Sequence, residues 1–224
     1  MLKALKDLTK DTLTYGAADA AGKVIGFFLL PLYTSYLTPQ DYGIISMLAF
    51  TYTFFSPIAA LGVTSAIFRR FNLAKEVKGQ KLVLSTGGLF VLINSTVLWI
   101  IAMLIAPILT RLLVDDVSLV YLFKIALAGC FFNSIGSIFT VLLRATRRVK
   151  LISVTLLIKL TFTILLTIYL VVILEKGAMG VVIADAVGAF IVCIILAYHS
   201  RAYLIQAFSR LELKALLSYG LPHL

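Results

Sequence analysis

Two oppositely charged residues stand one helical turn apart in the first strongly apolar stretch of the chain. Asp19 and Lys23 are spaced i, i+4, so a helix places both side chains on one face, where they can pair. One interpretation is an internal ion pair with a packing role. The other is a cation that faces a cavity and meets an anion, with the aspartate tuning it or carrying a proton. Physical arguments alone leave both interpretations open.

Two later apolar segments carry stripes of polar residues at helical spacing. Their members are Asn133, Ser137, Thr140 and Arg144 in one stripe, and Thr155, Lys159, Thr163 and Thr167 in the other. Serine and threonine in membrane helices often bond their own backbone, so a stripe alone is more often structural. A lysine or arginine within the stripe favours a water-lined position. Arg144 equally fits an interfacial residue that fixes topology, which is the more common case.

One acid and two prolines within apolar segments are further candidates for a functional role. Asp185, in VVIADAVGAF, has no cation on its own predicted helix and flanks small residues. It fits a protonatable coupling site or a neutral acid bonded to a neighbouring helix. Pro31 and Pro57 are predicted to bend two helices and to free backbone groups for neighbours or cavity water. Such bends suit a rocking transporter but occur in static bundles too.

The composition decides the class of protein in which these charges stand. The 224 residues are 61% hydrophobic and 13% charged, and the mean hydropathy is +1.05. Several apolar runs reach the roughly 20 residues that span a bilayer. The sequence therefore predicts an all-α membrane protein that crosses the bilayer several times. The two cysteines lie inside apolar segments and are expected to be small buried hydrophobes.

Six apolar runs are predicted to be transmembrane helices. They cover residues 12–37, 42–68, 82–110, 117–143, 151–174 and 178–200. Lysine and arginine gather in the N-terminal segment and after the even-numbered helices, which predicts a cytoplasmic N-terminus. The net charge of +10 follows from this alternation and not from one basic face, so nucleic acid is not an expected partner.

The first predicted helix is marginal on its own. A charge at a helix centre costs roughly 2.5–3.5 kcal/mol on insertion, and each Leu, Ile, Phe or Val returns only about 0.3–0.6 kcal/mol. The apolar residues of 12–37 then return on the order of 3–5 kcal/mol against about 5–7 kcal/mol for Asp19 and Lys23. This helix is expected to be buried against other helices or to face a wet cavity.

The end of the chain is predicted to link two similar units. Residues 205–214 alternate apolar and charged positions, as in an amphipathic linker on the cytoplasmic surface. LSYG at 217–220 echoes LTYG at 13–16, where a second six-helix unit would begin. The expected organisation is a six-helix lobe over 1–204, the linker, and the start of a seventh helix over 215–224. The chain is then the first half of a longer protein, or lobes pair between chains.

A long stretch near the N-terminus reads YGAADAAGKVIGFFLLPLYTSYLTPQDYGIISML, and LGVTSAIFRRF follows it. It resembles the start of polysaccharide transporters, the oligosaccharide-lipid flippases, whose superfamily also contains multidrug and toxin extrusion transporters. Matching features include the Tyr-Gly opening, Lys-x-x-Gly-Phe in the first helix, Asp-Tyr-Gly at the turn into the second, and Leu-Leu-Arg-Ala closing the fourth. The resemblance implies two bundles with twelve or more helices in total, arranged around a central cavity that opens by alternating access.

The resemblance also implies a cargo and a location. Such proteins move an undecaprenyl-diphosphate-linked glycan, for example an O-antigen, capsule or exopolysaccharide repeat unit, to the outer leaflet of a bacterial or archaeal cytoplasmic membrane. Expected partners are this lipid-linked glycan, the bilayer, and the glycan polymerase and chain-length machinery. Neither a cofactor nor a metal is expected, and a proton or sodium ion would supply the coupling.

The resemblance favours a functional role for Lys23, and the polar stripes add further candidates. The candidate substrate-binding residues are Lys23, Asn133, Arg144 and Lys159, and the candidate coupling or charge-pair residues are Asp19 and Asp185. No catalytic constellation is evident, and His199 and His223 stand isolated near helix ends, so an enzyme is not expected.

Two other functions stay open beside the flippase. A multidrug or cation antiporter of the same superfamily prefers a cavity dominated by acids, whereas Lys23 and Lys159 favour an anionic cargo. A non-transporting membrane scaffold of a glycan-assembly complex would tolerate neutral replacement of the intramembrane charges. The three functions therefore differ in what they require of the same few residues.

Overall fold

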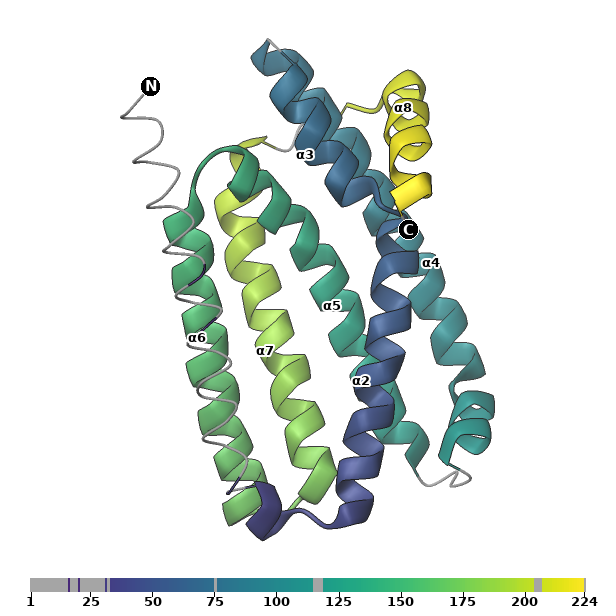
Figure 1. Ribbon diagram of the computed structural model, residues 1–224, viewed down its shortest axis with the longest axis vertical. Coiled ribbons are helices and arrows are strands. Elements are labelled where there is room, and N and C mark those ends of the chain that lie inside the picture. The colour runs from purple at the N-terminus through teal and green to yellow at the C-terminus, as the bar shows by residue number, and fades with distance from the viewer. Residues whose placement is uncertain are drawn as a thin grey trace.

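The computed structural model describes residues 16, 20, 31, 33–74, 76–114, 119–203 and 207–223. In this part of the chain every regular element is a helix, and the long helices run side by side along one axis (Figure 1). The elements are α2 (Pro39–Ala60), α3 (Val63–Leu73), α4 (Val77–Val114), α5 (Val120–Ala145), α6 (Val149–Ile168), the π-helical turn η2 (Tyr169–Ile173), α7 (Gly177–Ser200), the 3-10 turn η3 (Arg201–Tyr203), α8 (Arg210–Gly220) and the 3-10 turn η4 (Leu221–His223). The all-α prediction is confirmed for the described residues.

Five helices in this part of the chain are long and apolar enough to cross a membrane. They span Pro39–Ala60, Val77–Ile108, Val120–Ala145, Val149–Ile173 and Gly177–Ser200. Each corresponds to one of the last five predicted spans, and the chain is a multi-pass membrane protein. Most of the first predicted span, 12–37, lies outside the described residues, which include only 16, 20, 31 and 33–37 of it.

The predicted span 42–68 is wrong at its C-terminal end, because the chain leaves the helix before that point. Helix α2 stops at Ala60, and Leu61 and Gly62 take positive φ values of 46° and 67°. Left-handed residues cannot continue a right-handed helix, so α3 starts as a new helix at Val63. The apolar run continues through this break, which hides it from a hydropathy profile. The predicted loop 69–81 is also mostly helix, since α3 reaches Leu73 and α4 starts at Val77.

The buried apolar side chains form two clusters, one towards each end of the bundle. One cluster joins α3 to α4–α8 and includes Ile67, Leu84 and Leu142. The other joins α2 to the opposite ends of α4, α5 and α7 and includes Phe123 and Val182. Along α5 and α7, Asn133, Ser137 and Asp185 come between these two clusters, whereas Thr140 and Arg144 lie alongside the first cluster. Packing thus holds the ends of the helices together and leaves polar groups at the middle.

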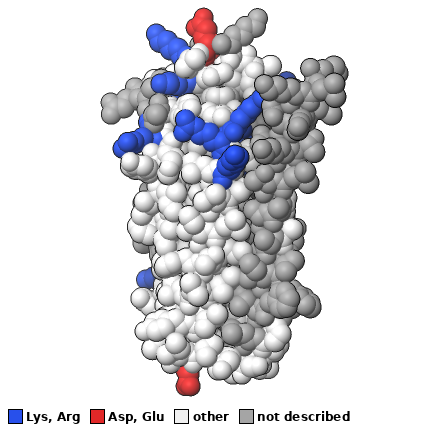
Figure 2. Space-filling model, turned by 90° about the vertical axis from the view of Figure 1, so that its left-hand side faces the viewer, with Lys and Arg blue, Asp and Glu red and all other residues white. Residues whose placement is uncertain are grey.

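Lysine and arginine gather near the end of the bundle that carries α3 and α8 (Figure 2). The described members of this basic end are Arg69, Arg70, Lys78, Lys81, Arg144, Arg147, Arg148, Lys150, Arg201, Arg210 and Lys214. At the opposite end the described connections and helix ends hold Arg111, Lys124 and Lys176, alongside Asp41 and Glu175. The helices therefore place the alternating charges of the sequence on two opposite ends of the molecule.

The acidic residue Asp41 organises the end opposite the basic one. Its carboxylate accepts hydrogen bonds from the backbone N–H and the hydroxyl of Thr38, at 2.9 and 2.8 Å, which caps α2. Its other oxygen accepts from the backbone N–H of Ala178, at 3.0 Å, in the first turn of α7. One side chain thereby stabilises the starts of two helices and ties them together.

Helix α8 is fastened to α3 and α4 at the basic end. Glu212 receives two hydrogen bonds from the guanidinium of Arg70, at 2.8 and 2.9 Å, and the Ser209 N–H donates to the Thr86 hydroxyl at 3.1 Å. Leu216 is fully buried against the core of the bundle. Helix α8 spans Arg210–Gly220. It therefore includes both the end of the predicted linker and the start of the predicted seventh helix, and the expected boundary at 214–215 falls inside it.

Gly62 lies where the backbones of the α2–α3 break and of α8 come closest. A Cβ atom added to Gly62 would lie 2.6 Å from the carbonyl carbon of Gly220 and nearer still to its oxygen. The left-handed conformation at Gly62 also disfavours any residue with a side chain. A glycine is therefore required here by both the conformation and the contact.

Replacing Gly62 by alanine is expected to lower the melting temperature of the purified protein. The left-handed conformation alone costs roughly 1–2 kcal/mol for alanine, and the backbone clash adds to it. Gly43→Ala is the matched control, because a Cβ at Gly43 meets nothing within 4 Å on the exposed side of α2. Thermal unfolding in detergent measures both variants, and equal melting temperatures would contradict the proposed contact.

Candidate functional site

Three of the four candidate substrate-binding residues line one cavity. The cavity has a volume of about 300 Å³ and lies between α3, α5, α6 and α7. Asn133 and Arg144 reach it from α5, and Lys159 reaches it from α6. We call it the basic cavity, because Arg144 and Lys159 are the charged residues of its lining. The structure thus brings together residues that the sequence separates by up to 26 positions.

The whole polar stripe of α5 faces the basic cavity. Asn133, Ser137, Thr140 and Arg144 are all among its lining residues. The first three also donate to backbone carbonyls of their own helix, at 3.0, 2.7 and 2.9 Å respectively. The two hydroxyl donors and one of the two Asn133 N–H donors are engaged, so attraction for an anion in this cavity comes mainly from the positive charges of Arg144 and Lys159.

The polar stripe of α6 behaves differently, because only Lys159 of its four members lines the basic cavity. The Thr155 hydroxyl donates to the Leu151 carbonyl at 2.8 Å, and Thr167 is fully buried. The hydroxyl of Thr163 lies against Gly188 of α7. In this helix the threonines serve packing, and the lysine alone reaches the cavity.

Lys159 forms an ion pair with Asp185 of the neighbouring helix α7. The Lys159 Nζ and Asp185 Oδ1 atoms are 3.2 Å apart, and the two side chains are 24% and 58% exposed. Both residues stand near the middle of their helices, at a depth where an isolated charge is costly. The pair supplies the neighbouring-helix partner that the sequence alone left open for Asp185.

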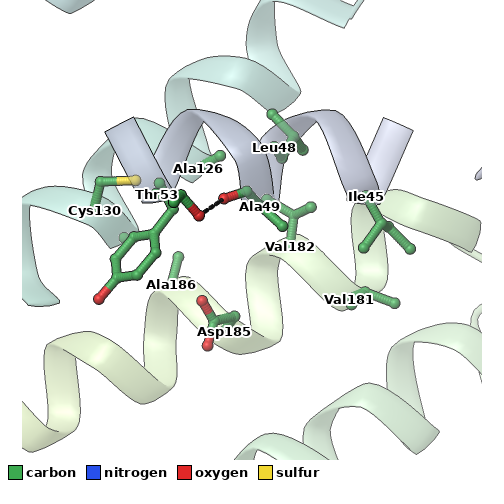
Figure 3. Close-up of a pocket in the computed structure, with 12 residues that line it drawn as sticks. Ile45, Leu48, Ala49, Thr53, Ala126, Cys130, Val181, Val182, Asp185 and Ala186 are labelled. Atoms are coloured by element: carbon green, nitrogen blue, oxygen red, sulfur yellow. Dashed lines mark hydrogen bonds between the residues drawn. The ribbon is translucent and has the colours of Figure 1, made fainter. Parts of the chain in front are cut away.

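Asp185 lines a second cavity, of about 350 Å³, between α2, α5 and α7. We call it the acidic cavity. Figure 3 shows the Asp185 carboxylate between the α7 backbone and the stretch of α2 that carries Ala49 and Thr53. Tyr52, Thr53 and Cys130 are its other polar lining residues, and aliphatic side chains form most of the remainder. Sequence reasoning missed Tyr52 and Thr53, although Ser46, Thr53 and Ser56 share one face of α2 at helical spacing and could have marked it.

Small residues of α7 allow the close helix contacts that position the ion pair. A Cβ atom at Gly188, one turn beyond Asp185, would meet the Thr163 hydroxyl and lie 3.4 Å from the Lys159 Cγ atom. Where α7 contacts α5, a Cβ atom added to Gly129 of α5 would lie 3.2 Å from the Ala186 Cα atom of α7. Small residues at such positions let helix backbones approach in a membrane bundle. The distance between Lys159 and Asp185 thus depends on glycine packing.

The remaining candidate residues are placed as follows. Lys23 and Asp19 lie outside the described residues. The Pro31 carbonyl accepts hydrogen bonds from the hydroxyls of Thr34 and Ser35, at 2.9 and 2.8 Å. Pro57 lies inside α2, four residues before the left-handed Leu61, whose N–H donates to the Pro57 carbonyl at 2.8 Å. Within the described residues there is no group of three or more side chains suited to hold a metal ion.

Substituting Gly188 by alanine is expected to destabilise the bundle by about 1–3 kcal/mol, because the added methyl group overlaps the Thr163 hydroxyl. Removing that hydroxyl in the double variant Gly188→Ala/Thr163→Ala should restore most of the loss in melting temperature, since the other contacts of the new methyl group are ordinary ones. Gly188→Ala/Thr163→Val keeps an atom in the hydroxyl position and should not recover. Equal recovery in both double variants would show that the contact is misassigned.

Comparison with known structures finds the same helical membrane fold in transporters. One structure described as a MATE protein in complex with MaD3S aligns with a TM-score of 0.75 at 21% identity, over 98% of this chain and 52% of that one. A multidrug resistance MATE family transporter of the MOP superfamily, in an outward-facing conformation, aligns with a TM-score of 0.72 at 19% identity, over 98% and 51%. No curated protein matches the chain significantly.

These structural likenesses show the fold, and the chain spans about half the length of the transporters it resembles. A sequence model of the family described as polysaccharide biosynthesis protein matches residues 8–224. The expected resemblance is therefore confirmed over nearly the whole chain. The chain belongs to the polysaccharide biosynthesis protein family and has the fold of one half of a MOP-superfamily transporter.

Proposed function

We propose that the chain forms half of a flippase that moves a glycan linked to undecaprenyl diphosphate across the cytoplasmic membrane of a bacterium or archaeon. The carrying observation is the basic cavity, which is lined by Lys159 from the middle of α6 and by Arg144 from the last turn of α5. A diphosphate is the part of such a cargo that needs cationic partners inside the bilayer. Lysine and arginine are the side chains that bind phosphate groups most strongly. Membership in the polysaccharide biosynthesis protein family supports this cargo class.

Asn133 supplies a polar amide to the same cavity and completes the proposed contacts among described residues. Lys23 is proposed as a further cargo contact and Asp19 as its charge partner, on the ground of their spacing in the sequence. Asp185 is the proposed site at which a proton or sodium ion couples to transport. The basic end of the bundle is proposed to face the cytoplasm, as positive charge on connecting loops does in membrane proteins, and the N-terminus with it.

A multidrug or cation antiporter is a second candidate, and one observation favours it. The acidic cavity combines the Asp185 carboxylate with Tyr52 and apolar walls, which suits a lipophilic cation. The two MATE structures fit this alternative as well as they fit a flippase. Lys159 weighs against it, because an ammonium 3.2 Å from the carboxylate would repel a cationic cargo.

Lys159→Gln and Arg144→Gln are expected to reduce glycan export roughly tenfold or more in cells that depend on this protein. Each variant loses a hydrogen bond between a charged side chain and the diphosphate, and such a bond contributes about 1.5–3 kcal/mol to the free energy of binding. Lys23→Ala should abolish export. The readout is surface glycan per cell, normalised to the amount of the protein in the membrane.

Lys124→Gln and Lys150→Gln are the matched controls, because both lysines are exposed and line neither cavity. Their export should stay at the wild-type level. Wild-type export by all three test variants would exclude the anion site and favour the scaffold function. Unchanged export with lost resistance to lipophilic cations would instead support the antiporter.

A further inference from the structure

We propose that Asp185 is an internal counter-ion that occupies the anion-binding position of Lys159 while no cargo is bound, and that a diphosphate binds there by displacing it. The inference rests on the proposed function, because it assumes that the basic cavity accepts an anion. It adds a defined competition between one carboxylate of the protein and the cargo. Asp185 thereby sets the affinity of the site without itself contacting the cargo.

The two partners of the ion pair belong to different cavities. Lys159 lines the basic cavity, and Asp185 lines the acidic one and is absent from the lining of the basic cavity. Lys159 therefore contacts Asp185 with its ammonium and also borders the space in which an anion would sit. When an anion binds the Lys159 ammonium in place of Asp185, the Asp185 carboxylate already faces a cavity of about 350 Å³ in which water can hydrate it. Its release requires no rearrangement of the helices.

The strength of the pair is suited to exchange. The Oδ1 atom lies 3.2 Å from the ammonium, and the Asp185 side chain is more than half exposed beside the acidic cavity, so the pair belongs to the partly exposed pairs that contribute little stability. Lys159 is far less exposed and stands in the middle of α6, where an unpaired charge is costly. The lysine thus needs an anion at all times, but it does not need this particular one. A diphosphate carries more negative charge than one carboxylate and offers more acceptor oxygens.

Displacement would also transfer charge between the cavities. With Lys159 engaged by cargo, Asp185 remains in the acidic cavity beside Tyr52 and Cys130, without its lysine. Occupation of one cavity then changes the electrostatic potential of the other. The chain thereby contains a direct electrostatic link between the cargo site and the acid proposed for coupling.

Binding of inorganic pyrophosphate to the purified protein in lipid nanodiscs tests the competition. Asp185→Asn should bind pyrophosphate about two- to fivefold more tightly than the wild type, which corresponds to the loss of a weak solvated ion pair. Lys159→Gln should bind at least tenfold more weakly, and the double variant should bind like Lys159→Gln alone. Asp185→Glu keeps the charge and should not gain affinity.

The matched controls are Glu175→Gln, which neutralises an exposed acid outside both cavities, and Lys124→Gln. Neither should change the affinity for pyrophosphate. Unchanged binding in Lys159→Gln would refute the anion site itself, and the counter-ion inference with it. Weaker binding in Lys159→Gln together with unchanged or weaker binding in Asp185→Asn would leave the proposed function standing and overturn the counter-ion alone.

A second arm separates the two sources of a diphosphate. An isoprenyl diphosphate is measured in the same variants as inorganic pyrophosphate. The same gain in Asp185→Asn with both ligands assigns recognition to the diphosphate group, and a gain with both ligands that is larger for the isoprenyl diphosphate assigns it to a lipid-linked diphosphate. Either result supports the counter-ion, and a gain with neither overturns it.

Two further measurements cover the case in which Asp185→Asn does not fold. Asp185→Ser is a second neutral variant and should show the same gain in affinity. In the wild-type protein, a hydrophobic carbodiimide should label Asp185 faster when pyrophosphate is present, because displacement frees the carboxyl group from Lys159. Labelling that is unchanged or slower with pyrophosphate rules out the displacement.

Discussion

Hydrocarbon tolerates a charged side chain only when another group compensates it, and the middle of this bundle is arranged around that requirement. Lys159 and Asp185 compensate each other across the contact between α6 and α7, at 3.2 Å. The contact depends on Gly188, whose missing side chain leaves room for Thr163 and the stem of Lys159. The two cavities lie on either side of this pair, one lined by its cation and the other by its acid. The polar chemistry of the described chain therefore depends on one helix contact.

The two ends of the bundle are held by different interactions. At the end opposite the basic residues, Asp41 caps α2 and accepts a hydrogen bond from the start of α7. At the basic end, the Arg70–Glu212 pair and the contact of Gly62 with Gly220 fasten α8 to the bundle. Apolar clusters fill the space inside both ends. Both ends of the bundle are thus held by contacts between residues that are far apart in the sequence.

The ion pair also explains why the fold alone does not decide the cargo. The same fold serves multidrug transporters among the structures it resembles, and function depends on the site that a fold carries. In this chain the site presents a cation to one cavity and an acid to the other, 3.2 Å apart. Which of the two charges meets the cargo separates a flippase from an antiporter. Arg144 adds a second cation to the lysine's cavity and favours an anion.

Hydropathy and charge patterning determined the helical membrane class and the five later spans, because both depend on residues close together in the sequence. The predicted 117–143, 151–174 and 178–200 lie within a few residues of α5, α6 with η2, and α7. The short sequence motifs predicted the family, and the helical spacing of the polar residues predicted the polar stripe of α5. Lys23 and Asp19, outside the described residues, remain predictions.

Only the tertiary structure decided the break at Leu61–Gly62, the partner of Asp185 and the existence of the acidic cavity. The break depends on a contact with Gly220, far along the chain. The ion pair and the cavity depend on the rotation and separation of neighbouring helices. Those quantities are set by packing at positions such as Gly188 and Gly129, which no periodicity within a single helix reveals.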